Sequence, residues 1–265
     1  MSTDIHSSAV VDPQAHIGQD VTIGPYVVIE KSTHIGDGCR IDAFAHIKSN
    51  TSLGANNCIH SYACLGGPPQ DVKFHGEETS LVIGDDNVIR EFVTINRGTI
   101  GGGGMTKIGS KCMIMAYAHI AHDCSLGNEV IMANAATLAG HVTIEDKAVI
   151  GGLSAVHQFV RIGSYAYIGG MSGVSQDVPP YMLIAGERAW LHGLNLIGLK
   201  RQGFSPEQIA ALKKAFKLLW RSGLRREDAL DQARAECGEQ PEVHELLSFV
   251  DQSERGVIAP KGAVK

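Results

Sequence analysis

Aliphatic residues recur along the chain at every sixth position. The first run covers residues 5–65, and the period returns over residues 83–95 and 108–174. A period of six matches neither the 3.6-residue repeat of an amphipathic α-helix nor plain strand alternation. It predicts short strands that are joined by sharp turns and stacked into a repeat protein.

The period also predicts the shape of the repeat. Three hexads form one triangular coil, so the chain returns to the same corner one parallel-strand spacing higher, about 4.8 Å. The aliphatic column then fills the axis of a prism, and each coil pairs with its neighbours. We therefore predict a mainly β fold, a parallel β-helix over residues 1–180. Glycine often follows the aliphatic residue, and we interpret these glycines as supplying the backbone freedom of a tight corner: Gly18, Gly24, Gly36, Gly54, Gly84, Gly109, Gly127, Gly151, Gly163 and Gly169.

Two segments break the period, at residues 66–80 and 97–107. Their Pro and Gly content makes them poor core material, so we expect loops that leave the prism. Loops on a rigid scaffold commonly carry function, although insertions without a role would have the same composition.

A different pattern follows residues 176–180, where two prolines cannot continue strand pairing. We predict a helical domain over residues 187–265. Ser205 and Pro206 are typical of an N-cap and a first helical residue, and an apolar stripe then runs through Ile209, Leu212 and Phe216. Further helical patterns cover residues 225–237 and 241–253.

Composition is typical of a soluble globular protein, because 44% of the residues are hydrophobic. The N-terminus lacks the basic start and apolar run of a secretory signal, and no stretch approaches the roughly 18 apolar residues of a membrane helix. We therefore expect a cytoplasmic protein without a membrane span. The six cysteines form no CxxC pair. This spacing indicates reduced thiols, and it does not argue for a zinc site.

The formal net charge is -5, but the charged residues are distributed unevenly along the chain. Residues 188–226 hold nine Lys or Arg and one acid, Glu207. This segment is a candidate surface for an anionic partner, with a solvated helix face as the alternative.

The repeat predicts which polar residues meet, because residues separated by multiples of eighteen stack. His122, His141 and His157 then fall near one corner of three successive coils. Asp123 falls directly below His141, and His119 lies one strand position away. An outward imidazole beside a carboxylate is typical of a general base, whose tautomer the acid fixes. Surface histidines stacked by repetition, or a zinc site between neighbouring chains, are the alternatives.

Several motifs are more specific than the hexads. They are AHIAHDC at residues 118–124, LAGH at 138–141, AVHQF at 155–159, GGxSGVxQDVPPY at 169–181 and NxxGLKRxGF at 195–204. With these motifs the chain resembles the acyl-[acyl carrier protein]:UDP-N-acetylglucosamine O-acyltransferase family, which acts first in lipid A synthesis. The resemblance covers nearly the whole chain. It implies a left-handed β-helix and a homotrimer with each site between two subunits.

The resemblance also implies a mechanism. His122 would deprotonate the 3-hydroxyl of UDP-N-acetylglucosamine, which then attacks the thioester of a 3-hydroxyacyl chain on acyl carrier protein. Asp123 would orient His122, and the backbone N–H of Gly140 would stabilise the oxyanion. The chemistry requires no metal or organic cofactor, and no nucleic acid takes part.

The resemblance also implies which residues contact the substrates, because they stand at the positions that do so in the family. Lys73 and Arg201 suit a diphosphate. The family's limit on acyl length maps to Gly170, with Tyr167 nearby, and a glycine there leaves room for a longer chain. The basic tail fits an acidic carrier protein. The full set of implied sugar-nucleotide contacts is Asp71, Lys73, His119, His141, His157, Gln158, Asn195 and Arg201.

Three positions depart from the family pattern. Asn96, Ile197 and Gln202 stand where His, Glu and a second Arg are common. Since these departures concern contacts to the sugar or nucleotide, a 3-amino analogue of the sugar, giving an N-acyl product, stays open as the acceptor. A γ-type zinc carbonic anhydrase, also a left-handed β-helix with interfacial histidines, and a non-enzymatic scaffold are the other hypotheses.

Overall fold

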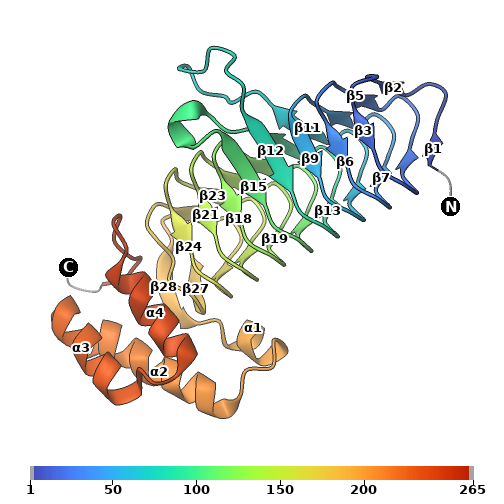
Figure 1. The fold of residues 1–265 in the computed structure, drawn as a ribbon. Helices are drawn as coiled ribbons and strands as arrows, with labels where there is room; N and C mark the ends of the chain where they lie inside the picture. Colours follow the sequence, from blue (N-terminus) through green and yellow to red (C-terminus); the bar gives the residue numbers. More distant parts are fainter. Residues whose placement is uncertain (1–2, 263–265) are drawn as a thin grey trace.

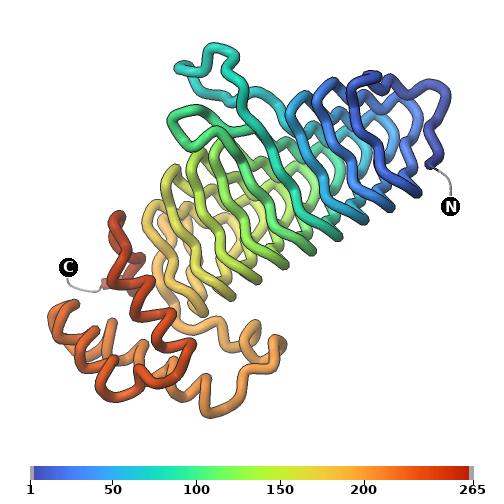
Figure 2. Tube along the Cα trace, viewed as in Figure 1, coloured from blue at the N-terminus to red at the C-terminus, as the bar shows by residue number. Residues whose placement is uncertain are grey.

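Short parallel strands stack into a long three-sided prism in the computed structural model, which describes residues 3–262 (Figure 1). The tube view shows the regular coils of this prism, with two loops projecting from one side and helices at the C-terminal end (Figure 2). The extremes of the two predicted ranges, residues 1–2 and 263–265, lie outside the described part of the chain.

Each side of the prism is one sheet. Sheet A runs in the order β1 (Asp4–Ile5), β4 (Thr22–Ile23), β7 (Arg40–Ile41), β10 (Cys58–Ile59), β13 (Val88–Ile89), β16 (Met113–Ile114), β19 (Ile131–Met132), β22 (Val149–Ile150), β25 (Tyr167–Ile168), β27 (Met182–Ala185) and β28 (Trp190–Leu194). Sheet B contains β2 (Val10–Val11), β5 (Val28–Ile29), β8 (His46–Ile47), β11 (Cys64–Gly67), β14 (Thr94–Asn96), β17 (His119–Ile120), β20 (Thr137–Leu138), β23 (Ala155–Val156) and β26 (Gly173–Val174). Sheet C contains β3 (His16–Ile17), β6 (His34–Ile35), β9 (Thr51–Leu53), β12 (Ser80–Ile83), β15 (Met105–Ile108), β18 (Ser125–Leu126), β21 (Thr143–Ile144) and β24 (Arg161–Ile162).

The strand register follows the predicted repeat. Ser125 pairs with Thr143, and Thr143 pairs with Arg161, each one full coil further along the chain. The aliphatic column points inward, so that Ile23, Ile120 and their equivalents are buried. At the open N-terminal end the column is uncovered, and Ile5 is 45% exposed.

The glycines that follow the aliphatic residues do not provide the corners, and this part of the prediction was wrong. Left-handed φ angles belong instead to other residues, such as Asp20 at 56° and Tyr26 at 57°. At Gly36, an added Cβ would lie 2.4 Å from the carbonyl carbon of Gly54 in the next coil. Glycine is required there because two backbones approach closely, and not because of its φ angle.

One corner of the prism carries a ladder of aromatic rings, which we call the corner ladder. Its rings stack with centroids 4.9 to 5.1 Å apart, one ring from each successive coil. They remain 42% to 63% exposed. The corner ladder consists of Tyr26, Phe44, Tyr62, Phe92 and Tyr117.

The helices follow the predicted caps. They are α1 (Leu196–Arg201), α2 (Pro206–Arg221), α3 (Arg226–Cys237) and α4 (Pro241–Asp251). Ser205 and Gln208 form a capping box at the start of α2, and the stripe of Ile209, Leu212 and Phe216 is buried, as predicted. Inside the range predicted to be helical, β28 instead pairs antiparallel with β27 and extends sheet A. Among the described helices, none combines the length and apolar character that a bilayer crossing requires.

Candidate active site

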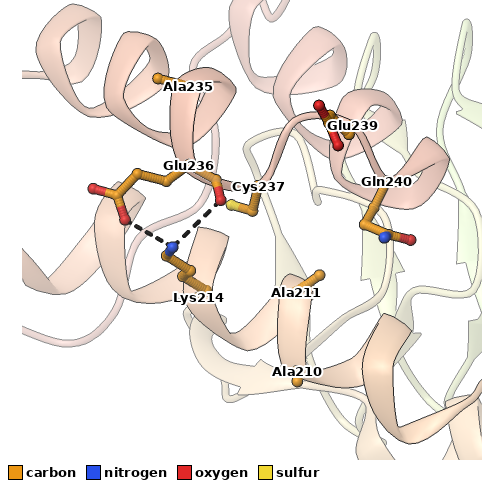
Figure 3. A pocket seen from close by; sticks show the side chains of 8 residues that line it. All are labelled: Ala210, Ala211, Lys214, Ala235, Glu236, Cys237, Glu239 and Gln240. Carbon is orange, nitrogen blue, oxygen red and sulfur yellow. Dashed lines mark hydrogen bonds and ion pairs between the residues drawn. The ribbon is translucent and has the colours of Figure 1, made fainter.

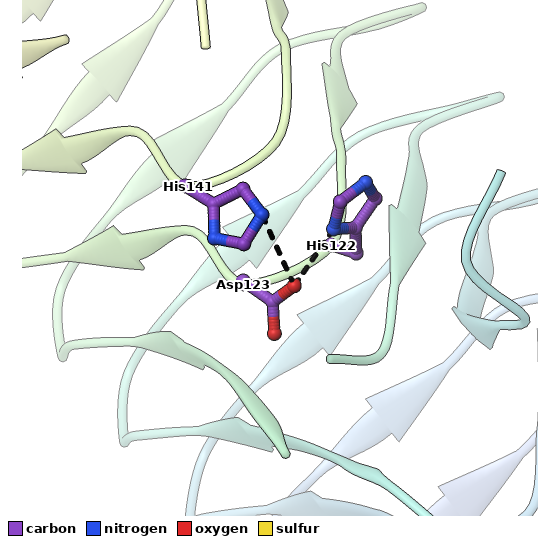
Figure 4. A group of neighbouring side chains, drawn as sticks. All are labelled: His122, Asp123 and His141. Atoms are coloured by element: carbon purple, nitrogen blue, oxygen red, sulfur yellow. Dashed lines mark hydrogen bonds and ion pairs between the residues drawn. The ribbon is translucent and has the colours of Figure 1, made fainter. Parts of the chain in front are cut away.

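His122 and Asp123 lie at a corner between sheets B and C. The Nδ1 atom of His122 lies 2.7 Å from Oδ2 of Asp123 (Figure 4). The side chain of Asp123 is completely buried, whereas that of His122 is 13% exposed. Because a carboxylate only accepts hydrogen bonds, the proton of the imidazole belongs on Nδ1, which leaves Nε2 as an acceptor.

The second out-of-period loop holds Asp123 in place. The backbone N–H of Thr99 donates to Oδ1 and its hydroxyl donates to Oδ2, both at 2.7 Å. Thr99 also caps the short 3-10 turn η1 (Ile100–Gly102) through the amide of Gly102. An added Cβ on Gly102 would lie 2.0 Å from Cγ of Asp123. This loop therefore packs directly on the carboxylate, a role for Thr99 and Gly102 that the sequence did not predict.

Gly140 faces His122 from the next coil. An added Cβ would lie 2.6 Å from Cε1 of His122 and 2.9 Å from its Nε2. The imidazole therefore packs directly on backbone at this position, and any side chain there would displace the ring. The predicted oxyanion residue thus lies beside the predicted base.

His141 and Phe159 continue the same corner above Asp123. All three residues have left-handed φ angles between 59° and 64°. His141 meets the ring of His122 edge to face at a centroid distance of 5.2 Å, and its Nε2 lies 3.7 Å from Oδ2 of Asp123. Phe159 stacks on His141 at 4.4 Å. The predicted stack is therefore present, and Phe159 completes it.

His119 lies on β17 next to His122. Its Nδ1 is 2.7 Å from the hydroxyl of Thr94 in the coil below. Burial lowers the pKa of His119, and the neighbouring His122 lowers it further. A neutral imidazole at this position favours hydrogen bonding to uncharged hydroxyl groups.

His157 lies at the outer end of the site and is exposed, as is Gln158. Its Nδ1 lies 3.3 Å from a guanidinium nitrogen of Arg255, which also donates to the carbonyl of Ser175. Arg255 lies in the segment after α4, outside the hexapeptide repeat, so the repeat could not predict its position. It adds a positive charge that the sequence analysis missed.

The first loop carries Asp71 and Lys73. Oδ1 of Asp71 accepts from the amide of Lys73 at 2.9 Å, which fixes a local turn and leaves the ammonium group exposed. The two loops contact each other, because the guanidinium of Arg97 lies 5.4 Å from the ring centroid of Phe74. Asn96 is buried and donates to the carbonyl of Pro68 at the base of the first loop.

Gly170 and Tyr167 lie on the other side of the same coils. An added Cβ on Gly170 would lie 3.3 Å from the carbonyl oxygen of Gly152, so two glycines stack in successive coils. Tyr167 belongs to β25 and is 37% exposed. Two successive coils therefore present bare backbone at this corner, at Gly152 and Gly170.

Asn195 precedes α1 as its N-cap and Arg201 ends the helix, and within residues 3–262 neither forms a hydrogen bond with His122. Asn195 caps α1 by accepting from the amide of Gly198 and donates to the carbonyl of Tyr165. Arg201 is exposed at the end of the helix. Ile197, at the start of α1, is 68% exposed, and Gln202 is its C-cap.

A separate pocket lies in the helical domain, between α2 and the end of α3 (Figure 3). Lys214 forms an ion pair with Glu236 at 2.9 Å on its wall. Cys237 also lines the pocket, and burial raises the pKa of its thiol. None of the predicted catalytic residues belongs to this pocket.

Two imidazoles and one carboxylate in the site have the arrangement of a metal-ligand set. Within residues 3–262, His122, Asp123 and His141 are the one group whose ligand atoms all lie within 4.8 Å of one another. Both oxygens of Asp123 already accept hydrogen bonds from Thr99, and Oδ2 also faces His122. A metal ion would compete with these bonds.

Comparison with protein families identifies both parts of the chain. A hexapeptide-repeat model of bacterial transferases matches residues 32–67 and 105–140. A model for the second domain of UDP-N-acetylglucosamine O-acyltransferase matches residues 177–258.

Solved structures with the same architecture cover nearly all of the chain. The UDP-N-acetylglucosamine O-acyltransferase from Moraxella catarrhalis is 40% identical, with a TM-score of 0.93 over 96% of this chain and 99% of that one. The UDP-N-acetylglucosamine acyltransferase from Bacteroides fragilis is 41% identical, with a TM-score of 0.94 and the same coverage of both chains. The predicted left-handed parallel β-helix with a C-terminal helical domain is thereby confirmed.

Curated relatives match over the same length. The acyl-[acyl-carrier-protein]–UDP-N-acetylglucosamine O-acyltransferase from Thermodesulfovibrio yellowstonii is 51% identical over 254 residues, which is 96% of this chain and 98% of that protein. Its counterpart from Syntrophobacter fumaroxidans is 52% identical over 255 residues, 96% and 99% of the two chains. The chain belongs to the acyl-[acyl-carrier-protein]–UDP-N-acetylglucosamine O-acyltransferase family.

Proposed function

We propose that this enzyme transfers a 3-hydroxyacyl chain from acyl carrier protein to the 3-hydroxyl of UDP-N-acetylglucosamine, in lipid A synthesis. The observation that carries this proposal is the contact between His122 and the buried Asp123, with the backbone of Gly140 against the imidazole. A base, its orienting acid and an oxyanion donor are what acyl transfer to a hydroxyl requires.

His122 acts as the general base. Its Nε2 accepts the proton of the sugar hydroxyl, while Asp123 accepts from Nδ1 and stabilises the imidazolium that forms. The sugar oxygen attacks the thioester carbonyl, and the new C–O bond gives a tetrahedral oxyanion. The oxyanion accepts a hydrogen bond from the amide of Gly140. Its collapse breaks the C–S bond, and the departing thiolate takes the proton from His122.

Polar side chains around this corner bind the sugar nucleotide. They contact the sugar and the nucleotide from β17, in the case of His119, and from the segments that follow β20 and β23, in the case of His141, His157 and Gln158. Lys73 supplies positive charge for the diphosphate, and Arg255 adds a second cation beside His157.

The acyl chain lies along the glycine strip of Gly152 and Gly170. Because neither residue carries a side chain, the surface accepts a long chain, and Tyr167 borders it. A bulky residue at position 170 would shorten the accepted chain.

The enzyme acts as a homotrimer with shared sites. Asn195 and Arg201 contact the nucleotide from a second subunit, which accounts for their position on α1, away from His122. Exposed apolar side chains along one corner support assembly, including the corner ladder, Leu153 at 67% and Met171 at 72% exposure.

The carrier protein docks on the helical domain. Lys213, Lys217 and Arg221 are exposed on α2, and Lys200 lies on α1 nearby in sequence. This basic surface complements an acidic carrier. The proposed reaction takes place in the cytoplasm, as the sequence predicts.

The test is to incubate the enzyme with UDP-N-acetylglucosamine and a panel of 3-hydroxyacyl carrier proteins. Mass spectrometry should detect an acylated sugar nucleotide, and mild base should release the acid because the product is an ester. A base-stable product from a 3-amino sugar nucleotide alone would indicate the N-acyl reaction instead. No product from any chain length would overturn the proposal.

The metal-ligand set of His122, Asp123 and His141 favours one second candidate, a zinc enzyme of the γ-carbonic anhydrase type. Stoichiometric zinc in the purified protein, with carbon dioxide hydration that a chelator abolishes, would support this candidate. Acyl transfer that survives a chelator would exclude it as the main function.

A further inference from the structure

A second cluster of reactive side chains lies on the outer face of sheet A, in the N-terminal half of the prism. Arg40 and Cys58 occupy equivalent positions in β7 and β10 and pair in register. Asp42 and His60 follow these strands and stack in the same way. None of these residues belongs to the proposed acyl-transfer site.

The thiol, imidazole and carboxylate of this cluster form a relay. Sγ of Cys58 lies 3.6 Å from Nε2 of His60, and Nδ1 of His60 lies 3.0 Å from Oδ2 of Asp42. Glu91 lies further from the same Nδ1, at 3.8 Å, and its carboxylate is bonded to Arg90. The order of nucleophile, base and orienting acid is that of an activated thiol.

Arg40 adds a positive charge at the sulfur. Its Nη2 lies 2.9 Å from Sγ of Cys58, and its Nη1 lies 3.4 Å from Oδ1 of Asp42. The pKa of the guanidinium is raised, first by the hydrogen bond to Cys58. A cation at this distance stabilises an anionic sulfur, which is the nucleophilic form of cysteine.

Burial dominates the environment of the other cysteines. Burial raises the pKa of Cys112 to about 11 and that of Cys124 to about 12. Burial also raises the pKa of the thiols of Cys39, Cys64 and Cys237. Cys58 is half-buried and is the cysteine that contacts both a guanidinium and an imidazole.

The cluster is arranged for proton transfer and not for metal binding. Within residues 3–262, the ligand atoms of Cys58, His60 and Asp42 do not converge into a metal-ligand set. The imidazole instead lies between the other two groups and uses a different ring nitrogen for each.

We propose that Cys58 is a nucleophilic thiol that forms mixed disulfides with small soluble disulfides. His60 accepts the thiol proton at Nε2, and Sγ attacks one sulfur of the disulfide. The new S–S bond forms as the old one breaks, and the leaving thiolate takes the proton from His60. The exposed guanidinium of Arg40 pairs with a carboxylate of a peptide disulfide, such as glutathione disulfide.

The first test compares two thiols in the unaltered enzyme. The enzyme is incubated with glutathione disulfide, and adducts are quantified by intact-protein and peptide mass spectrometry. Cys64 is the matched control, because it is also half-buried but has no guanidinium contact in the described chain. We expect Cys58 to react about tenfold faster than Cys64 or more. Equal rates, or no adduct on Cys58 in the folded enzyme, would overturn the proposal.

The second test distinguishes activation of the Cys58 thiol by its neighbours from simple solvent access. His60→Gln and Arg40→Gln should each slow adduct formation at Cys58 about tenfold, with the adduct rate at Cys64 unchanged. Circular dichroism and acyl transfer by the same variants report whether the fold is intact. Unchanged rates at Cys58 in folded variants would show that solvent access alone determines its reactivity.

Discussion

The amide and the hydroxyl of Thr99 each lie 2.7 Å from a carboxylate oxygen of Asp123, and the hydroxyl shares Oδ2 with Nδ1 of His122. From this relationship we predict that the second loop positions the proposed base without contact to substrate. Thr99→Val removes the hydroxyl donor but keeps the shape and the amide. Since a hydrogen bond to a charged group is worth about 1.5 to 3 kcal/mol, we expect kcat to fall about tenfold or more, with little change in KM.

Thr22→Val is the control for this change. Thr22 is exposed on β4 of sheet A and pairs with Asp4 and Arg40, which are outside the proposed site. Steady-state kinetics of both variants should separate the two positions. Equal losses would mean that the hydroxyl of Thr99 does not position Asp123.

Replacement of His122 tests the base itself. General-base catalysis typically contributes about 10²- to 10⁴-fold, so His122→Ala should lower kcat by that factor. Binding of UDP-N-acetylglucosamine, measured by calorimetry, should persist because the other polar residues remain. Activity within threefold of the unaltered enzyme would refute the assigned base.

Replacement of Gly140 tests whether the close approach of its backbone positions the ring of His122. In Gly140→Ala the new Cβ would lie 2.6 Å from Cε1 of His122, so the ring must shift. A displacement of this kind costs about 10²-fold in kcat. Gly101→Ala is the control, since its Cβ would meet nothing within 4 Å. A crystal structure of Gly140→Ala with an unmoved His122 would contradict the explanation.

The stack of His122, Asp123 and His141 could be predicted because no insertion interrupts the chain between β17 and β24. One coil is therefore a fixed number of residues, and position in the sequence gives position on the prism. The corner conformation could not be predicted in the same way. Glycine has two uses, positive φ and close approach, and the sequence alone does not tell which one applies at Gly36.

The sequence also could not predict the contacts that are made by segments outside the repeat. Thr99 reaches Asp123 from a loop without register, and Arg255 reaches His157 across 98 positions of sequence. Such contacts depend on how a loop or a terminal arm folds back, which no periodicity determines. The residues that hold Asp123 and approach His157 were therefore missed, although the proximity of His122, Asp123 and His141 was predicted.

The corner ladder should contribute to stability although it is exposed. Phe44 stacks on Tyr26 at 5.1 Å and on Tyr62 at 5.0 Å. Loss of two aromatic contacts in Phe44→Ala should lower the free energy of unfolding by about 1 to 2 kcal/mol. Urea denaturation at fixed protein concentration measures this change. Val72→Ala, at a side chain that is 96% exposed, should have no effect, and equal losses in the two variants would argue against the stack.

Glu30 should make stability depend on acid pH. Burial alone would raise the pKa of this carboxyl, but hydrogen bonds from the amide and hydroxyl of Ser49, from Lys48 and from His46 lower it from 4.5 to about 2. A folded-state pKa below the ordinary value means that the ionised group stabilises the fold above pH 4.5. This contribution is lost as the pH falls from 4.5 to about 2.

Glu30→Gln should therefore lower the free energy of unfolding at neutral pH by about 1 kcal/mol, a value reduced by solvent screening of a partly exposed group. The difference from the unaltered enzyme should shrink as the pH approaches about 2, because protonation removes the same charge. Urea denaturation over this pH range measures both effects. Glu254→Gln, at an exposed glutamate, is the matched control. A difference that stays constant down to the lowest pH would show that packing, and not the charge of Glu30, stabilises this coil.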